Sequence, residues 1–372
     1  MYDHRTKIVA TVIITAIILT LFTLFVSSED APKTSARAAA LYIPETDTFV
    51  CSKNMNERLG MASTTKIMTA LISLERLMPD STVRVDPRAV GTEGSSVYLE
   101  SGETMSAEDL IYSLMLRSAN DAAAALAYEI SGSIEDFAAL MNERARSLGL
   151  SDTSFKNPHG LDEEGHYTTA HDLAIITAEA MKNEAFRKIV STYKKNVTGS
   201  CAVRLVVNHN KLLRSYDGAI GVKTGYTKRC GRSLVGAAER DGLTLISVTI
   251  DAPNDWSDHK RLLDYGFMRF HKIVLPDSDG YEQRLPVVDG IKECVAVGLK
   301  QKFSYIYEGD EPDFKENVIL DRFAVAPLRR GDVLGKITYS LDGNIIGECE
   351  IIALEDIAKT PKKRAAFDIF NK

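Results

Sequence analysis

The pattern of apolar and polar residues changes first near the N-terminus. An uncharged run of nineteen residues extends from Ile8 to Val26, shortly after Arg5 and Lys7. As a helix, this run would be about 28 Å long at about 1.5 Å per residue, which is enough to cross the apolar part of a bilayer. Positive charges before such a run keep that end in the cytoplasm and send the rest of the chain across the membrane. We therefore expect residues 1–26 to be a signal peptide or a membrane anchor, and the sequence leaves both open.

After a polar linker expected at residues 27–37, the pattern predicts strands, then helices, then strands again. Two apolar runs flank a turn-prone stretch at residues 44–47, which predicts a β-hairpin. In the middle of the chain, apolar residues recur three and four positions apart, as on the buried face of a helix. The expected helices cover residues 66–77, 107–116, 120–130, 134–148, 170–182 and 258–270, and the later strands cover 203–207, 219–223, 233–238 and 243–250. Strands at both ends with helices between them indicate an α+β domain at residues 38–275, with an antiparallel sheet packed against helices.

The pattern changes again after Pro276. Short β runs separated by turns such as Asp342-Gly343 continue to about residue 354, with almost no helical periodicity. This pattern predicts a small all-β accessory domain at residues 277–357. A short basic and apolar tail, residues 358–372, ends the chain.

Composition narrows the class of protein. Hydrophobic residues make up 45% of the chain and charged residues 26%, which argues against a wholly disordered or many-spanning membrane protein. The formal net charge is −6 and the basic residues are scattered, so we expect no nucleic-acid partner. Five cysteines without a CxxC spacing give no indication of a disulfide scaffold, a zinc ribbon or a redox motif.

Ser63 and Lys66 are the first candidates for chemistry. They stand three residues apart at the start of a predicted helix, so a helical turn brings the amine to the same face as the hydroxyl. A serine nucleophile needs a base within hydrogen-bonding reach, and a lysine of lowered pKa can serve. Spacing alone is weak evidence, because the chain contains two further pairs of this kind, Ser191 with Lys194 and Ser257 with Lys260.

Two later motifs distinguish Ser63 from the other serines. Ser118-Ala119-Asn120 supplies a second hydroxyl and an amide, and Lys223-Thr224-Gly225 supplies a cation, a hydroxyl and a glycine at the end of a β run. Peptidases and lactamases of the Ser-Lys type carry these three elements in this order. Lys223 and Thr224 can hold a substrate carboxylate, and Gly225 lets substrate backbone approach the strand closely.

On these motifs the chain resembles the low-molecular-mass penicillin-binding D-alanyl-D-alanine carboxypeptidases. The resemblance covers residues 38–354 and is strongest at residues 62–70, 117–123, 157–161 and 221–227. It implies a DD-peptidase/β-lactamase-like catalytic domain with a small β-sandwich beside it. The implied partners are peptidoglycan stem peptides, β-lactam antibiotics and the cytoplasmic membrane, outside which the enzyme would work.

The resemblance also implies roles for individual residues. Ser63 is expected to be the nucleophile, Lys66 its general base and Ser118 a proton relay. The backbone N–H groups of Ser63 and Tyr226 are expected to form the oxyanion hole. The expected substrate-binding residues are Asn120, Lys223, Thr224, Gly225 and Tyr226. The implied mechanism uses no metal and no cofactor.

One feature departs from the family pattern. Relatives often carry an arginine for the substrate carboxylate on the helix after the last sheet hairpin, and the corresponding stretch of this chain looks shorter. Arg232 and Arg261 are both candidates for that task.

Three other functions compete with this interpretation. A β-lactamase of the same fold would use a glutamate to activate water, and Glu163 and Glu164 stand in about the right region. A non-catalytic peptidoglycan-binding relative would be expected to lack a catalytic residue, yet every motif position is filled. A zinc carboxypeptidase would use neighbouring histidines, of which the chain has His159, His166 and His171, but no HExxH motif is found.

Overall fold

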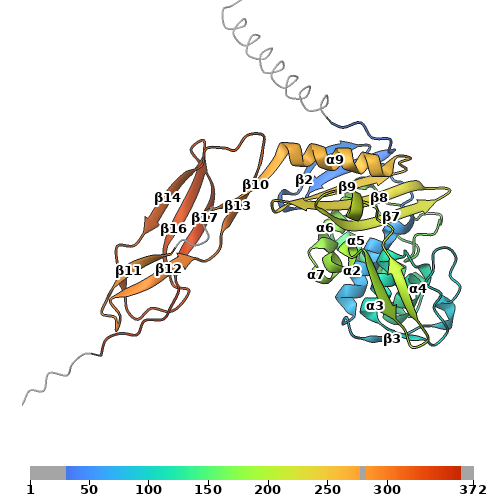
Figure 1. The fold of residues 1–372 in the computed structure, drawn as a ribbon, viewed down its shortest axis with the longest axis horizontal. Coiled ribbons are helices and arrows are strands. Elements are labelled where there is room, and N and C mark those ends of the chain that lie inside the picture. The colour runs from blue at the N-terminus through green and yellow to red at the C-terminus, as the bar shows by residue number, and fades with distance from the viewer. Residues whose placement is uncertain (1–30, 277–281, 362–372) are drawn as a thin grey trace, which may run out of the picture. The chain divides into compact units, whose positions relative to one another are not determined.

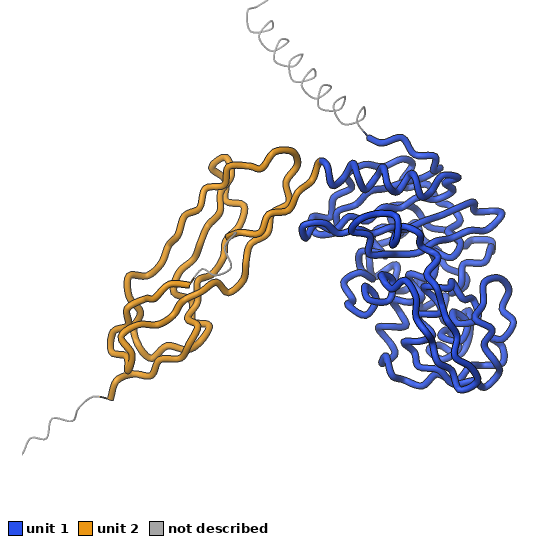
Figure 2. Tube along the Cα trace, in the orientation of Figure 1, with its two compact units in different colours: residues 1–268 blue, residues 269–372 orange. Residues whose placement is uncertain are grey.

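The computed structural model describes residues 31–276 and 282–361, and it forms two compact units that divide between Met268 and Arg269 (Figure 2). The predicted signal or anchor lies outside the described residues, as does the tail from residue 362 onward. Within the described ranges, no helix is long and apolar enough to span a bilayer.

The first unit contains a five-stranded antiparallel sheet that gathers the two ends of the unit. Strand β1 is buried along its whole length and pairs with β9, so that Ala40 lies opposite Val248. The strand order is β2-β1-β9-β8-β7, which leaves β7 at an edge. The strands are β1 (Ala38–Ile43), β2 (Thr48–Lys53), β7 (Ala219–Thr227), β8 (Gly231–Arg240) and β9 (Leu243–Ile250).

Helices cover both faces of this sheet. Figure 1 shows α9 along one face and a group that includes α2, α5 and α6 on the other. Four alanines at residues 122–125 are buried, and their small side chains let α4 pack closely among its neighbours. The helices are α2 (Lys66–Arg76), α3 (Ala107–Leu116), α4 (Asn120–Ser131), α5 (Ile134–Ser147), α6 (Ala170–Met181), α7 (Glu184–Ser191), α8 (Leu212–Ser215) and α9 (Asp255–Arg269).

Hydroxyl side chains begin three of these helices. Ser106, Ser133 and Thr169 each accept a hydrogen bond from the backbone N–H three residues later, at distances of 3.0–3.1 Å. Such caps satisfy donors that have no partner inside the helix. At the other end of α4, Gly132 adopts the left-handed conformation with φ 78°, which stops the helix.

The predicted α+β class is confirmed, and most elements begin and end close to their predicted bounds. The exceptions have local causes. Helix α7 was not predicted, because its eight residues are too few to show a clear helical period. Strand β5 (Lys194–Thr198) was not predicted either, because it is largely polar; it pairs with β6 (Val203–Val207) in a small two-stranded sheet. Helix α9 begins at Asp255 rather than at residue 258. A further small sheet joins β3 (Thr82–Arg84) to β4 (Thr104–Ser106).

The second unit is entirely β in its described residues. It has a six-stranded sheet of order β14-β16-β17-β12-β11-β15 and a two-stranded sheet of β10 with β13. Its own apolar core includes Val295, Ile337 and Ile351, all fully buried. The strands are β10 (Phe270–Leu275), β11 (Gln283–Val288), β12 (Cys294–Leu299), β13 (Phe303–Glu308), β14 (Lys315–Leu320), β15 (Ala324–Val325), β16 (Val333–Leu341) and β17 (Asn344–Ala353). Since β10 pairs with β13, the units divide before β10, whereas the predicted domain limit falls after it.

Candidate active site

Ser63 lies in a 3-10 turn, residues Ala62–Thr65, that leads directly into α2. Two glycines from distant segments pack against this turn. A Cβ on Gly160 would lie 2.0 Å from the carbonyl oxygen of Ala62, and one on Gly225 would lie 3.2 Å from the backbone nitrogen of Ser63. A side chain at residue 160 would not fit, and one at residue 225 would be packed unusually tightly. The loop around residue 160 and the edge strand β7 therefore both pack against the turn that carries the serine.

The amine of Lys66 lies between three oxygen atoms. Its Nζ is 3.0 Å from the hydroxyl oxygen of Ser63 and 2.7 Å from the amide oxygen of Asn120, and it also donates to the carbonyl oxygen of His159. Asn120 is oriented in turn, because its Nδ2 donates to the carbonyl oxygen of Glu93. The lysine side chain is fully buried, so its amine is directed by these contacts rather than by water.

Burial makes Lys66 a better base. It lowers the pKa of Lys66 well below its ordinary value, and the positive charge of Lys223 lowers this pKa further, against a smaller opposing effect of Asp121. Burial also lowers the pKa of Lys223 to about 7. The nearby His159 is held neutral, with a pKa lowered to about 3 chiefly by burial. A neutral amine at Lys66 can accept the proton of the Ser63 hydroxyl.

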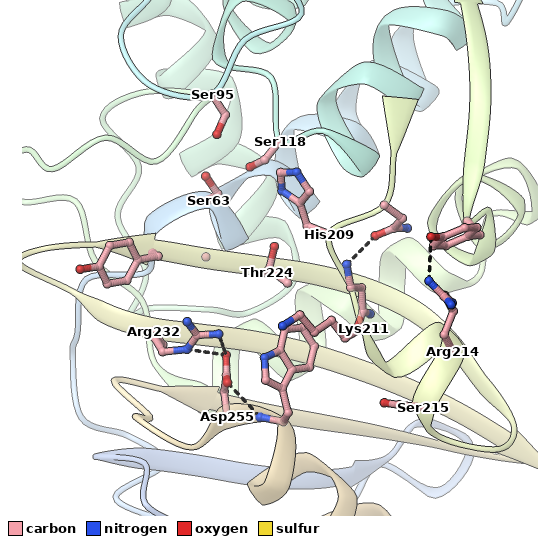
Figure 3. A pocket seen from close by; sticks show the side chains of 16 residues that line it. Ser63, Ser95, Ser118, His209, Lys211, Arg214, Ser215, Thr224, Arg232 and Asp255 are labelled. Atoms are coloured by element: carbon pink, nitrogen blue, oxygen red, sulfur yellow. Dashed lines mark hydrogen bonds and ion pairs between the residues drawn. The ribbon is translucent and has the colours of Figure 1, made fainter. Parts of the chain in front are cut away.

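A cleft of about 840 Å³ opens over the serine (Figure 3). Five of the eight predicted site residues line it: Ser63, Ser118, Thr224, Gly225 and Tyr226. The other three, Lys66, Asn120 and Lys223, are buried, and the Nζ of Lys223 donates to the carbonyl oxygen of Thr224 at 2.9 Å. The structure thus brings all three motifs together, with hydroxyls at the surface of the cleft and amines beneath it.

The structure distinguishes the two candidate arginines. Arg232 lines the cleft. Its Nε donates to one carboxylate oxygen of Asp255 at 3.1 Å, and its Nη2 lies 3.0 Å from the same oxygen in an ion pair. Arg261 is not among the residues that line the cleft and pairs with Asp258 on its own helix.

Sequence reasoning missed one end of the cleft. Tyr193, the segment 208–211, Arg214, Ser215 and Trp256 also line it, and none of them belongs to a recognised motif. The only signal was compositional: Trp256 is the single tryptophan of the chain.

The glutamates and histidines of the competing functions have other contacts. Glu163 accepts a hydrogen bond from Asn157 at 3.1 Å, and neither it nor Glu164 lines the cleft over Ser63. His166 contacts Thr65 and His171 contacts Asp172. Among the residues that the structure describes, no three His, Cys, Asp or Glu side chains form a group that could hold a metal ion.

Comparisons with known proteins identify similar chains along almost the whole length. Residues 26–254 match the family described as D-alanyl-D-alanine carboxypeptidase, and residues 274–359 match the C-terminal domain of penicillin-binding protein 5. The D-alanyl-D-alanine carboxypeptidase DacF of Bacillus subtilis is 32% identical over 383 residues, covering 98% of this chain and 97% of its own. DacC of Escherichia coli is 33% identical over 347 residues, covering 88% and 86%.

Solved structures agree with these matches. Penicillin binding protein 5 from Haemophilus influenzae superposes with a TM-score of 0.64 at 28% identity, covering 88% of this chain and 99% of its own. The Streptomyces K15 DD-transpeptidase gives a TM-score of 0.61 at 33% identity, covering 64% of this chain and 99% of its own.

Proposed function

The chain belongs to the D-alanyl-D-alanine carboxypeptidase family, and from this premise we propose which of its residues carry out the reaction. It is a serine-type D-Ala-D-Ala carboxypeptidase, which removes the terminal D-alanine from peptidoglycan pentapeptide stems through an acyl-enzyme and which reacts with β-lactams. The observation that carries the assignment is the contact between the buried amine of Lys66 and the hydroxyl of Ser63, 3.0 Å apart.

Acylation begins when the Ser63 hydroxyl attacks the carbonyl carbon of the penultimate D-alanine while Lys66 takes its proton. The carbonyl oxygen becomes negative and is stabilised by the backbone N–H groups of Ser63 and Tyr226. Collapse of this intermediate breaks the C–N bond, and the proton reaches the leaving amine through Ser118. Water then attacks the ester and releases the shortened peptide.

The edge strand β7 gives the substrate its orientation. The sheet ends at this strand, so its outer edge can pair with an extended peptide as with an added strand. Gly225 lines the cleft and lets β7 lie close to the turn that carries Ser63, and Asn120 is held beneath the cleft between Lys66 and Glu93. Extended pairing would hold the scissile carbonyl above Ser63.

We propose that Thr224 and Arg232 bind the carboxylate of the substrate. Lys223, which is buried beneath the cleft, adds positive charge at this site. Arg232 stands opposite Tyr226 in the pairing of β8 with β7, within the cleft. Asp255 contacts two nitrogens of the Arg232 guanidinium, and the third nitrogen is turned away from Asp255 (Figure 3). A guanidinium held in this way loses little freedom on binding a carboxylate.

The cellular location is the finer part of the proposal. Arg5 and Lys7 ahead of the uncharged residues 8–26 support export of the enzyme across the cytoplasmic membrane, with a signal peptide or an anchor at its outer face.

Labelling with a fluorescent penicillin tests the proposal, together with D-alanine release from a diacetylated Lys-D-Ala-D-Ala peptide. The wild-type enzyme should be labelled and should release D-alanine. Ser63→Ala should do neither, while Ser191→Ala and Ser257→Ala should behave as the wild type. A label that maps to Ser191 or Ser257, or no label on the folded wild type, would overturn the assignment.

A further inference from the structure

The cleft continues past Thr224 into a region that hydrolysis of a terminal D-alanine does not use. We call this region the basic arm and define it by Tyr193, Lys211, Arg214, Ser215 and Trp256. In Figure 3, Ser63 lies on one side of Thr224, and Lys211 and Arg214 lie on the other. A leaving D-alanine whose carboxylate is held at Thr224 ends before it reaches this arm.

The backbone of the basic arm is held in place by two asparagines. Asn208 donates to the carbonyl oxygens of Val190 and Thr192 and accepts from the N–H of Asn210 at 2.9 Å. Asn210 in turn accepts from the N–H of Leu212, a fully buried residue. The segment that carries Lys211 and Arg214 is therefore anchored on its inner side, while both cationic side chains are exposed.

Aromatic rings position the two cations. Arg214 donates to the hydroxyl of Tyr193 at 3.0 Å, and its guanidinium carbon lies 5.1 Å from the centre of that ring. The amine of Lys211 lies 5.8 Å from the centre of the Trp256 ring. Contacts of this kind orient a cation without neutralising it.

The charge of the basic arm is not compensated locally. In the described part of the chain, neither Lys211 nor Arg214 forms an ion pair with a carboxylate. Asp255 is the only carboxylate among the sixteen residues that line the cleft, and it is already paired with Arg232. The chain as a whole carries a formal charge of −6, so two uncompensated cations at this place favour an anionic ligand.

We propose that the basic arm is a subsite for a leaving group that is larger than D-alanine and negatively charged. This inference rests on the proposed function. The substrate class consists of peptides in which the residue after the acyl D-alanine carries a second carboxylate, as a branched or cross-linked stem would supply. The chemistry is unchanged: Ser63 forms the ester, the C–N bond breaks, the leaving amine takes the proton, and water hydrolyses the ester.

The test uses three peptides with the same acyl part, ending in D-Ala-D-Ala, D-Ala-D-Glu and the neutral analogue D-Ala-D-Gln. For the full-length wild type we expect kcat/KM to be about tenfold higher for D-Glu than for D-Gln, since a charge-assisted hydrogen bond contributes about 1.5 kcal/mol or more. The double variant Lys211→Gln with Arg214→Gln should lose this preference while its kcat/KM for D-Ala-D-Ala stays within about twofold.

A matched control changes the same net charge outside the cleft: Lys228→Gln with Arg229→Gln, two exposed residues of the β7–β8 turn. This control should keep the preference for D-Glu. Penicillin labelling at Ser63 verifies that each variant is folded. If the double variant fails to fold, the single variants Lys211→Gln and Arg214→Gln replace it, and each should lose part of the preference for D-Glu.

The outcomes separate the two proposals. If the wild type does not hydrolyse D-Ala-D-Ala, the proposed function fails. If it hydrolyses D-Ala-D-Ala but shows no preference for D-Glu, or if the variants of Lys211 and Arg214 keep that preference, only the basic-arm subsite is overturned.

Discussion

The amine of Lys66 lies 3.0 Å from the hydroxyl oxygen of Ser63, where the 3-10 turn that carries the serine becomes helix α2. The helix sets the spacing of the pair, and burial lowers the pKa of the lysine, which favours the neutral amine that a general base requires. The reactivity of the serine therefore depends on the protonation state of one buried amine.

Replacing Lys66 should abolish acylation without unfolding the enzyme. A positioned general base contributes about 10²- to 10⁴-fold to such a step. We expect Lys66→Ala to lower the rate constant for acylation by benzylpenicillin by at least about 100-fold, measured by stopped-flow fluorescence. Lys66→Met, which fills the buried volume better, should lose as much activity, and circular dichroism should show both variants folded. Acylation at the wild-type rate would show that Lys66 is not the base.

The charge of Lys223 should set the acid limit of activity. Acylation requires neutral Lys66, so its rate falls as pH drops through the pKa of that residue. The positive charge of Lys223 lowers this pKa, so removing the charge in Lys223→Gln raises it. The acid limb of the profile of acylation rate against pH should therefore move to higher pH. Lys228→Gln, an exposed change in the β7–β8 turn, should leave the limb in place, and an unmoved limb in Lys223→Gln would contradict the coupling.

Arg232 should determine the binding of the substrate carboxylate. A charge-assisted hydrogen bond contributes about 1.5–3 kcal/mol, so Arg232→Gln should lower kcat/KM for D-Ala-D-Ala peptides by about 10- to 100-fold. Most of the loss should be in KM. Asp255→Asn should have a smaller effect in the same direction, because the arginine keeps its charge but loses its ion-pair partner. Arg261→Gln is the control, since Arg261 pairs with Asp258. If Arg261→Gln is impaired and Arg232→Gln is not, the assignment is reversed.

The penicilloyl-enzyme should persist for minutes or longer. D-alanine departs and leaves room for the deacylating water, whereas the leaving nitrogen of a penicillin stays tethered to the adduct. Glu163 and Glu164 lie outside the cleft over Ser63, so neither should activate water there. Mass spectrometry at timed intervals after mixing with benzylpenicillin should show a stable adduct whose lifetime is the same in Glu163→Gln and Glu164→Gln. Rapid turnover that either substitution abolishes would instead indicate a β-lactamase.

The catalytic unit should lose stability in acid through its buried histidines. His259 is fully buried between Ser247 and Thr249, and burial lowers its pKa to about 3. The unfolded chain takes up this proton near pH 6.5 and the folded chain does not, so the free energy of unfolding falls as pH drops from 6.5 towards 3.

His259 alone should contribute about 1.4 kcal/mol per pH unit within that window. Urea denaturation between pH 6 and pH 4 should show that the free energy of unfolding of His259→Gln falls less steeply with falling pH than that of the wild type, by that amount. An unchanged slope in His259→Gln would contradict the prediction.

The sequence alone determined most of the long helices and strands of the catalytic unit and the three-residue spacing that pairs Ser63 with Lys66. Both are local properties: a periodic apolar face needs only ten or so neighbouring residues, and a three-residue spacing on a helix brings two side chains together. Helix α7 and strand β5 were missed for the same reason, because one is too short and the other too polar to show a period.

The tertiary structure decided what the candidate residues can do. Lys66 is hydrogen-bonded to Asn120 and to the carbonyl oxygen of His159, 54 and 93 positions away, and its pKa depends on burial by several segments. The choice of Arg232 over Arg261 depends on which arginine reaches the cleft. The basic arm depends on the fold in the same way, because it brings Lys211 near Trp256, 45 positions away. Desolvation and charge pairing are set by atoms that distant parts of the chain bring together, so no local pattern in the sequence encodes them.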